Sequence, residues 1–247
     1  MNNEPKKEWK AEKLSVIIPC YNEIENIGEV IKAVESVDVG IPKEIIVVDD
    51  GSQDGTVKVL KEIHEKRRSG DDLMTIHYSM LNFGKGTAIR IGLKYVTGDI
   101  VIIQDADMEY DPKDYPRIIQ PIIDGEKDVV YGSRFLGKPR PKGMKFANWL
   151  FNRIISSLAR ILYPGRKLTD EATCYKAFKS EIILSFDLKC ERFEFCPEVT
   201  AKVLKGPYSF MEVPIFYEGR SIDEGKKIGW WDGVEAIWTL LRYRFKN

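Results

Sequence analysis

The chain alternates short apolar runs with longer stretches of helical periodicity, and this alternation restricts it to few folds. Buried strands are predicted at residues 14–19, 44–50, 73–79, 100–105 and 128–131. Helices are predicted between them, at residues 23–37, 56–68, 84–96 and 112–125. Strands that alternate with helices of this length form βαβ units with right-handed crossovers. The pattern therefore predicts an α/β fold, with a mostly parallel central sheet flanked by helices.

The pattern changes after residue 133, where the helices become longer and more amphipathic. Strands at 173–179 and 209–217 are predicted to flank a helix at 197–204. Broad apolar faces mark helices at 145–163 and from residue 232 onward. The predicted organisation has three parts: a polar tail at 1–13, one catalytic α/β domain at 14–229 and a C-terminal amphipathic helix at 230–247.

Charge is segregated along the chain although the formal net charge is zero. Nine acidic residues fall between residues 98 and 128, whereas nine basic residues and no acidic one fall between 134 and 169. A chain without net positive charge has no overall electrostatic attraction for the phosphates of a nucleic acid, so we expect no nucleic-acid partner. The basic block is also rich in apolar residues, which suits an anionic membrane surface.

The cysteines and histidines exclude some chemistries. The four cysteines have no close metal-type spacing, and two histidines make no convincing zinc site. No signal peptide is evident, so a reduced cytosolic setting is expected. No apolar run reaches the ~20 residues that a membrane span needs.

Polar groups follow four predicted strands at the point where each strand ends. They are Tyr21-Asn22-Glu23, Asp49-Asp50, Asn82 to Gly86 and Asp105-Ala106-Asp107. Ligands of open parallel sheets bind beyond the carboxyl ends of the strands. Each group alone fits a helix cap or a turn, but all four together predict one binding crevice.

The Asp105-Ala106-Asp107 triplet places two carboxylates at the end of a buried strand, with Glu109 close by. Hard carboxylate oxygens suit Mg²⁺ or Mn²⁺, which often share a substrate diphosphate. Gly84-Lys85-Gly86 resembles a fragment of a phosphate loop without the full spacing. Its lysine and the backbone amides of the helix start are expected near a nucleotide.

The motifs resemble those of family 2 glycosyltransferases with the GT-A fold. The resemblance covers about residues 14–231. It rests on Val16 to Glu23, Val47 to Thr56, Asn82 to Gly86 and Asp105-Ala106-Asp107. The segments Gly132 to Phe135 and Tyr217 to Ser221 are similar to the branch of dolichol-phosphate mannose synthases.

The resemblance implies a role for each matching residue. The nucleotide-sugar pocket would be lined by Pro19, Tyr21, Glu23, Asp50, Lys85, Asp105, Ala106 and Asp107. Asp105 and Asp107, with Glu109 added, would hold the metal. The acceptor phosphate would be bound by Arg134, Arg153, Arg220, Lys226 and Lys227. Catalytic roles would fall to Asp107, Arg134 and Arg220.

The acceptor decides whether the reaction needs a base. The family reaction is an inverting displacement, and a lipid phosphate acceptor is already anionic. A hydroxyl acceptor would instead need a base, for which Asp170 and Glu171 are the candidates. Helix capping and salt bridging explain these two residues equally well.

The sequence does not decide which nucleotide sugar is the donor. Members of this branch commonly have glutamine two residues after the second aspartate, whereas this chain has Glu109. The extra carboxylate of Glu109 would either join the metal ligands or indicate a donor sugar other than mannose. GDP-mannose, UDP-glucose and a UDP-N-acetylhexosamine all fit.

A polyprenyl or dolichyl phosphate acceptor implies a membrane surface. The helices at 145–163 and 232–246 carry tryptophans and flanking basic residues, as interfacial helices do. Packing on the sheet or a homodimer contact would use the same apolar faces. We expect a peripheral protein on the cytoplasmic face of the membrane.

Three hypotheses follow. The first is a metal-dependent inverting glycosyltransferase that moves a hexose or N-acetylhexosamine from a nucleotide diphosphate to dolichyl or polyprenyl phosphate. The second is a family 2 enzyme that acts on a soluble or glycan hydroxyl. The third is a noncatalytic nucleotide-sugar-binding protein.

Overall fold

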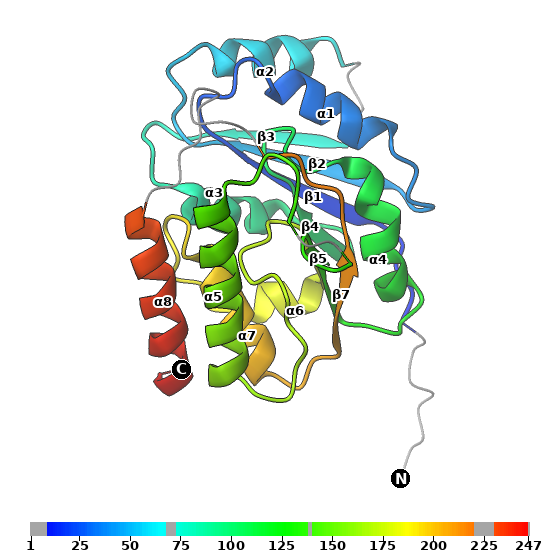
Figure 1. The fold of residues 1–247 in the computed structure, drawn as a ribbon. Coiled ribbons are helices and arrows are strands. Elements are labelled where there is room, and N and C mark those ends of the chain that lie inside the picture. Colours follow the sequence, from blue (N-terminus) through cyan, green and yellow to red (C-terminus); the bar gives the residue numbers. More distant parts are fainter. Residues whose placement is uncertain (1–8, 68–72, 138–139, 220–229, 247) are drawn as a thin grey trace.

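The computed structural model describes residues 9–67, 73–137, 140–219 and 230–246. One seven-stranded sheet organises them, with strand order β3-β2-β1-β4-β6-β5-β7 (Figure 1). The strands are β1 (Leu14–Cys20), β2 (Lys43–Asp49), β3 (Met74–Tyr78), β4 (Ile100–Ile103), β5 (Val129–Ser133), β6 (Lys176–Lys179) and β7 (Phe210–Pro214). Six strands run in one direction, and β6 is antiparallel to both of its neighbours. The predicted α/β class and the mostly parallel sheet are confirmed.

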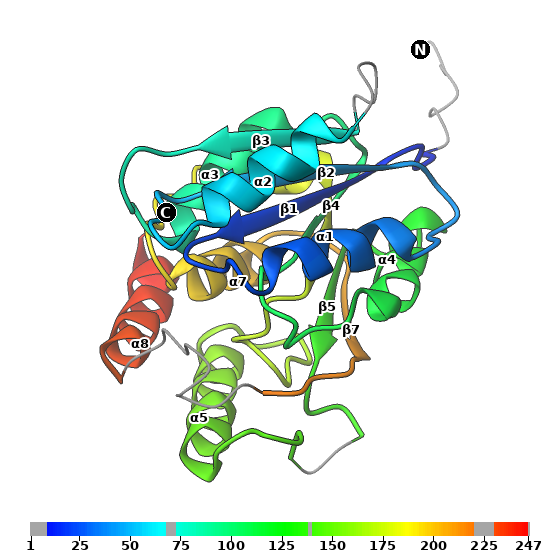
Figure 2. The same ribbon diagram turned by 90° about the horizontal axis from the view of Figure 1, so that it is seen from above.

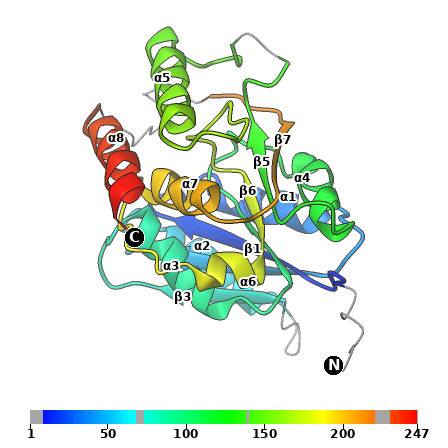
Figure 3. The same cartoon turned by 90° about the horizontal axis from the view of Figure 1, so that it is seen from below.

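The helices pack in layers on the two faces of the sheet. They are α1 (Ile27–Ser36), α2 (Thr56–Glu65), α3 (Lys85–Gly92), α4 (Tyr115–Ile123), α5 (Phe146–Leu162), α6 (Ser180–Ser185), α7 (Phe195–Lys205) and α8 (Trp230–Phe245). Short 3-10 helices are η1 (Leu93–Tyr95) and η2 (Pro112–Asp114). Helices α1 and α2 cover one face, and α3, α6 and α7 lie on the other (Figures 2 and 3).

The central strands are continuous apolar runs because both of their faces are covered. Every residue of β1 and β4 is buried. The strand ends agree with the sequence prediction to within about two residues, except that β6 begins three residues late and β7 ends three residues early. Helix α6 was missed because its six residues follow β6 without a turn signal.

The first helix differs from the prediction. Residue Asn22 was expected to cap a helix that starts at Glu23, but α1 begins at Ile27. Asn22 instead has a left-handed backbone, with φ of 50°, and its side chain accepts a hydrogen bond from Gln53 N at 2.8 Å. The segment after β1 is therefore a loop that is hydrogen-bonded to the turn between β2 and α2.

Helices α5 and α8 lie side by side beside α7, away from the centre of the sheet (Figures 1 and 3). In α8, the side chains of Ala236, Thr239, Leu240 and Tyr243 are buried, whereas those of Val234 and Trp238 are exposed. Among the described residues, no helix is both long and apolar enough to cross a bilayer.

Candidate functional site

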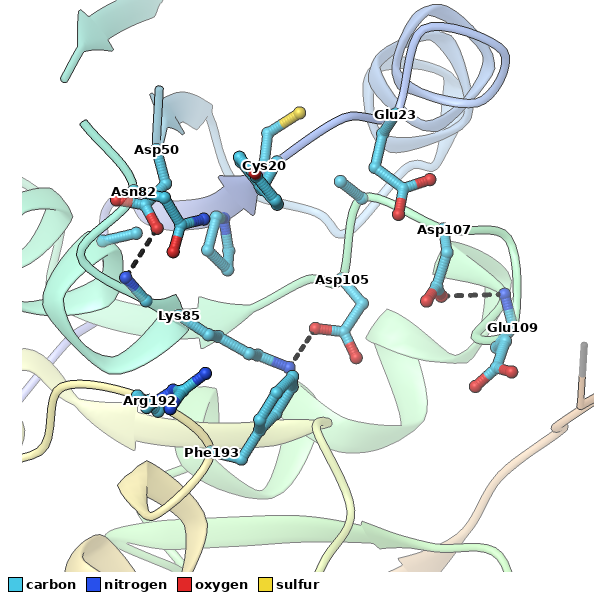
Figure 4. Close-up of a pocket in the computed structure, with 15 residues that line it drawn as sticks. Cys20, Glu23, Asp50, Asn82, Lys85, Asp105, Asp107, Glu109, Arg192 and Phe193 are labelled. Atoms are coloured by element: carbon cyan, nitrogen blue, oxygen red, sulfur yellow. Dashed lines mark hydrogen bonds and ion pairs between the residues drawn. The ribbon is translucent and has the colours of Figure 1, made fainter. Parts of the chain in front are cut away.

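A cavity of about 260 Å³ opens at the carboxyl ends of β1, β2 and β4 (Figure 4). The structure brings the predicted nucleotide-sugar residues together there. The lining is Pro19, Cys20, Tyr21, Glu23, Asp50, Asn82, Gly84, Lys85, Ala88, Asp105, Ala106, Asp107, Glu109, Arg192 and Phe193. All four predicted strand-end groups contribute, which is the geometry expected of an open sheet. The role of each side chain stays a prediction.

Asp50 fixes the loop that forms one wall of the cavity. Its carboxylate accepts hydrogen bonds from Phe83 N at 2.9 Å and Gly84 N at 2.7 Å. Burial raises the pKa of Asp50, and these two bonds counteract part of that effect. The loop between β3 and α3 is therefore anchored to the end of β2.

The Gly84-Lys85-Gly86 segment is not a phosphate loop. Gly86 N donates to Arg192 O and Thr87 N donates to Glu191 O, both at 2.9 Å, so these amides are already occupied. A Cβ on Gly84 would lie 2.4 Å from Glu191 O, and one on Gly86 would lie 2.9 Å from Arg192 O. The glycines are needed because another backbone segment crosses here. The expected contact between nucleotide and the amides of the helix start is therefore wrong for these two amides.

That crossing segment supplies two lining residues that the sequence prediction missed. Arg192 and Phe193 lie across the cavity from Cys20 and Glu23 (Figure 4). Arg192 comes 110 residues after Asn82 and 85 residues after Asp107 in the sequence, and the two residues follow no strand of the parallel core. The paired glycines at 84 and 86 were the available signal, since they marked a close backbone approach.

Lys85 points to Asp105 and forms an ion pair with it at the floor of the cavity (Figure 4). Burial opposes the charge on Lys85, but the Asp105 carboxylate, with smaller contributions from Cys174 and Cys196, raises the lysine pKa well above its usual value. The Lys85 ammonium also lies 3.4 Å from the Cys174 sulfur. The cavity thus holds a half-buried cation beside the carboxylate predicted to bind metal.

A buried amide orients the aspartate triplet. Gln104 Oε1 accepts from the hydroxyls of Tyr115 and Tyr175, each at 2.7 Å. Its Nε2 donates to the carbonyl of Asp105 at 3.0 Å. The end of β4 is therefore held by side chains from α4 and β6.

The three predicted metal ligands face different partners in the structure. Asp105 faces Lys85, and Asp107 Oδ1 accepts from Glu109 N at 3.2 Å. Glu109 Oε2 accepts from the hydroxyl of Tyr217 at 2.9 Å. Within the described residues, no three histidine, cysteine or acidic side chains form a group that could hold a metal. The two aspartates fit a hard divalent cation by donor type, because a cation that keeps waters needs only one or two protein carboxylates.

Arg134 lies in a buried ion pair outside the cavity lining. Its Nε and Nη2 each donate to Asp170 at 2.7 Å, and its backbone N donates to the same carboxylate at 2.9 Å. The guanidinium also lies over the ring of Tyr217, 5.1 Å from its centroid. This bidentate pair joins β5 to the segment before β6, and a contact with an acceptor phosphate stays a prediction.

The two candidate bases are both fully buried. Asp170 is committed to Arg134. Neither carboxylate oxygen of Glu171 accepts a hydrogen bond in the part of the chain that is described. Burial raises the pKa of Glu171 to about 6, although nearby Lys176 lowers it. Neither residue lines the cavity.

Of the remaining predicted acceptor residues, Arg153 is the one that the structure describes. Arg153 is exposed on α5, with its guanidinium 5.9 Å from the centroid of the Phe135 ring. Arg220, Lys226 and Lys227 lie outside the described residues. Their roles stay predictions.

Comparisons with known proteins agree on one family. A model described as glycosyl transferase family 2 matches residues 15–185. A dolichol-phosphate mannosyltransferase of Pyrococcus furiosus is 31% identical, over 95% of this chain and 63% of that protein. A UDP-N-acetylglucosamine–dolichyl-phosphate N-acetylglucosaminyltransferase of Methanococcus voltae is 34% identical, over 94% of this chain and 96% of that protein. The chain thus spans less than two thirds of the length of the first relative.

Solved structures share the fold. The crystal structure of glucosyl-3-phosphoglycerate synthase from Mycobacterium tuberculosis, in complex with Mn²⁺, UDP and phosphoglyceric acid, matches with a TM-score of 0.71. Its sequence is 21% identical, and the match covers 96% of this chain and 80% of that chain. At this identity the likeness establishes the arrangement of helices and strands.

Proposed function

Because the chain belongs to glycosyltransferase family 2, we propose that it transfers a sugar from a nucleotide diphosphate to a polyprenyl phosphate. The observation that carries the proposal is the cavity at the strand ends, where Lys85, Asp105 and Asp107 meet. Two acids and a half-buried lysine in one cavity suit a diphosphate with its cation. Two curated relatives named for transfer to dolichyl phosphate support the acceptor class.

The proposed reaction is a single displacement with inversion. An oxygen of the acceptor phosphate forms a bond to the anomeric carbon, and the bond from that carbon to the donor diphosphate breaks. The nucleoside diphosphate leaves with the electron pair. Asp105 and Asp107 would hold a Mg²⁺ or Mn²⁺ ion, which would offset charge on the leaving diphosphate. Lys85 is placed to donate to the same oxygens once it separates from Asp105.

The buried acids favour a phosphate acceptor over a hydroxyl acceptor. A hydroxyl must lose a proton to a base within hydrogen-bond reach. Asp170 is paired with Arg134, and Glu171 has no exposed surface. A phosphate monoester is already anionic and needs neither of them.

A membrane surface is the proposed setting, on the cytoplasmic face. Exposed apolar residues recur at helical spacing on one side of α5 and of α8: Phe146, Leu150, Ile154, Ile161, Trp231, Val234, Trp238 and Phe245. Exposed basic residues accompany them: Arg153, Arg160, Arg242, Arg244 and Lys246. Tryptophan with flanking cations is typical of helices that lie in an anionic bilayer surface. This charge favours lipid over a second subunit as the occupant.

Nucleotide binding tests the donor half of the proposal. Thermal shifts of the full chain with UDP, GDP and their sugars, each with Mg²⁺ or Mn²⁺, should single out one base, because a ligand of the folded state raises the apparent stability. We expect Asp107→Asn to weaken the metal-dependent binding about tenfold or more. Glu109→Gln is the matched control, since its amide oxygen can still accept from Tyr217. We expect it to stay within about twofold of the wild type.

Two results would contradict the proposal. One is equal metal-dependent binding by Asp107→Asn and the wild type. The other is an enzyme that binds the donor and transfers its sugar to a hydroxyl acceptor, but not to a polyprenyl phosphate in detergent. A fall in affinity for Glu109→Gln as large as for Asp107→Asn would add Glu109 to the metal shell.

A further inference from the structure

The segment from Lys189 to Phe193 connects the donor cavity with the C-terminal helix. Its far end supplies Arg192 and Phe193 to the cavity lining. Its near end lies against α7. The segment is not part of the sheet, so its position depends on the groups that form hydrogen bonds with its backbone.

Glu198 of α7 holds the near end of the segment. Its carboxylate accepts from Lys189 N at 2.9 Å and from Cys190 N at 2.7 Å. The Glu198 side chain is 1% exposed. Charge-assisted bonds of a buried carboxylate to backbone amides are among the stronger hydrogen bonds in proteins. Glu198 therefore fixes where the segment begins.

The far end of the segment is bound to α3. The carbonyls of Glu191 and Arg192 accept from Thr87 N and Gly86 N, each at 2.9 Å. Backbone atoms of the segment lie so close that a Cβ at Gly86 would meet them at 2.9 Å. A shift of the segment must therefore shift the start of α3, and Lys85 with it.

Tyr243 of α8 completes the connection. Its hydroxyl donates to Glu198 Oε1 at 2.8 Å in a buried contact. Lys202 lies 3.6 Å from the same oxygen, on the more exposed side of α7. Without the tyrosine hydroxyl, Lys202 and the Cys190 thiol are the side chains that remain close to the Glu198 carboxylate, and the charged lysine would draw it away from the amides.

We propose that Glu198 is a positioning residue for donor binding and that Tyr243 makes its position depend on α8. The inference rests on the proposed function, because it takes the cavity as the donor site. The C-terminal helix then takes part in forming the nucleotide pocket through one carboxylate and one backbone segment.

The test compares two tyrosines that both tether α8. Tyr243→Phe removes the bond to Glu198. Tyr163→Phe removes a bond of equal length, 2.8 Å, from the Tyr163 hydroxyl to the carbonyl of Leu240 on α8, which does not involve Glu198. Both variants loosen α8 by one buried hydrogen bond. Only the first one disturbs the segment at 189–193.

We expect Tyr243→Phe to raise the Kd for UDP or GDP with Mg²⁺ about fivefold, since the bond it removes is made to a charged group. The KM for the donor should rise by the same factor, while kcat and the KM for a polyprenyl phosphate in detergent stay within about twofold. Tyr163→Phe should leave donor affinity within about twofold at a similar loss of thermal stability. Glu198→Gln should exceed the effect of Tyr243→Phe, since it removes the charge that both amides face.

The outcomes separate the two hypotheses. Equal rises in Kd for the two tyrosine variants, or no rise for Tyr243→Phe, overturn the positioning role while the proposed function stands. A wild-type chain that binds neither UDP nor GDP overturns both. Should Glu198→Gln fail to fold, the comparison of the two tyrosine variants decides by itself.

Discussion

Glu171 is an acidic residue whose side chain the fold buries completely. Its oxygens accept no hydrogen bond from any residue that the structure describes, and its backbone N donates to the hydroxyl of Ser156 at 2.9 Å. The nearest cation, Lys176, instead donates to the carbonyls of Glu171 and Thr173, both at 2.6 Å. Burial in such a place disfavours the ionised form of a carboxyl and so raises its pKa.

This burial predicts how stability depends on pH. The pKa of Glu171 is raised from 4.5 to about 6, so the folded state holds this proton more tightly than the unfolded state. The contribution of Glu171 to stability should fall as the pH rises from 4.5 through 6 and stay unfavourable above. We expect Glu171→Gln to raise the thermal midpoint at pH 8, by about 2–4 °C for each kcal/mol gained. Thermal denaturation at pH 5 and pH 8 measures the difference.

The control is Glu181→Gln on α6, where the side chain is exposed. It should leave the midpoint unchanged at both values of pH. A midpoint of Glu171→Gln that falls equally at pH 5 and pH 8 would show that the ionised Glu171 imposes no cost.

Residues at strand ends could be predicted from the sequence, whereas long-range pairs could not. Alternating apolar runs define where a parallel strand stops, and so Asp50, Asp105 and Asp107 were found. The pairing of Arg134 with Asp170 joins residues far apart in sequence. Charge alone gives no register for such a pair, so the sequence did not predict it; the role of Arg134 at a phosphate came from the family resemblance and stays a prediction.

At the scale of elements, the contact between α3 and the segment at 189–193 determines the shape of the cavity. The start of α3 needs glycine at two positions because the segment crosses it closely. Sequence patterns predicted the helix itself, and its residues 85–92 lie within the expected range of 84–96. They did not predict the crossing, because an irregular segment has no periodicity to recognise.

Gly86→Ala tests this crossing. A Cβ there would lie 2.9 Å from the backbone of Arg192 and of Cys190, and backbone cannot rotate away as a side chain can. We expect a loss of about 1–3 kcal/mol in the free energy of unfolding, as for other overpacked sites. Urea denaturation measures this loss, and weaker UDP or GDP binding should accompany it.

Gly28→Ala in α1 is the matched control, because a Cβ there would meet nothing within 4 Å. It should be neutral or stabilise by up to about 1 kcal/mol, as alanine favours helices over glycine. A neutral result for Gly86→Ala would mean that the crossing segment moves aside freely.

At the scale of the whole molecule, α5 and α8 are neighbouring helices (Figure 1), and both carry exposed apolar and basic residues at the molecular surface. The heptad-like spacing of these residues was visible in the sequence. Their exposure was not, because an amphipathic pattern does not say whether its apolar face meets the sheet. In α8, Ala236, Leu240 and Tyr243 face the protein, whereas Val234, Trp238 and Phe245 face outward.

Vesicle binding tests this surface. The double variant Trp231→Ala and Trp238→Ala should weaken binding to anionic vesicles at least about tenfold. Each substitution removes a large apolar side chain that would be buried in the bilayer surface on binding. Flotation at low salt measures the bound fraction, and binding of the wild type should fall as salt screens the basic residues. Leu184→Ala, an exposed apolar residue on α6, is the control and should bind like the wild type.

The reversed strand β6 affects how the protein is made. It lies between β4 and β5, yet it follows β5 in the chain, and the other neighbour of β5 is β7. During synthesis, β5 therefore leaves the ribosome before either of its partners exists. An unpaired strand is a template for aggregation, and pairings this distant in sequence form slowly. We expect the block of β1 to β4 to fold on the ribosome, whereas the second half of the sheet closes only after residues 210–214 have emerged.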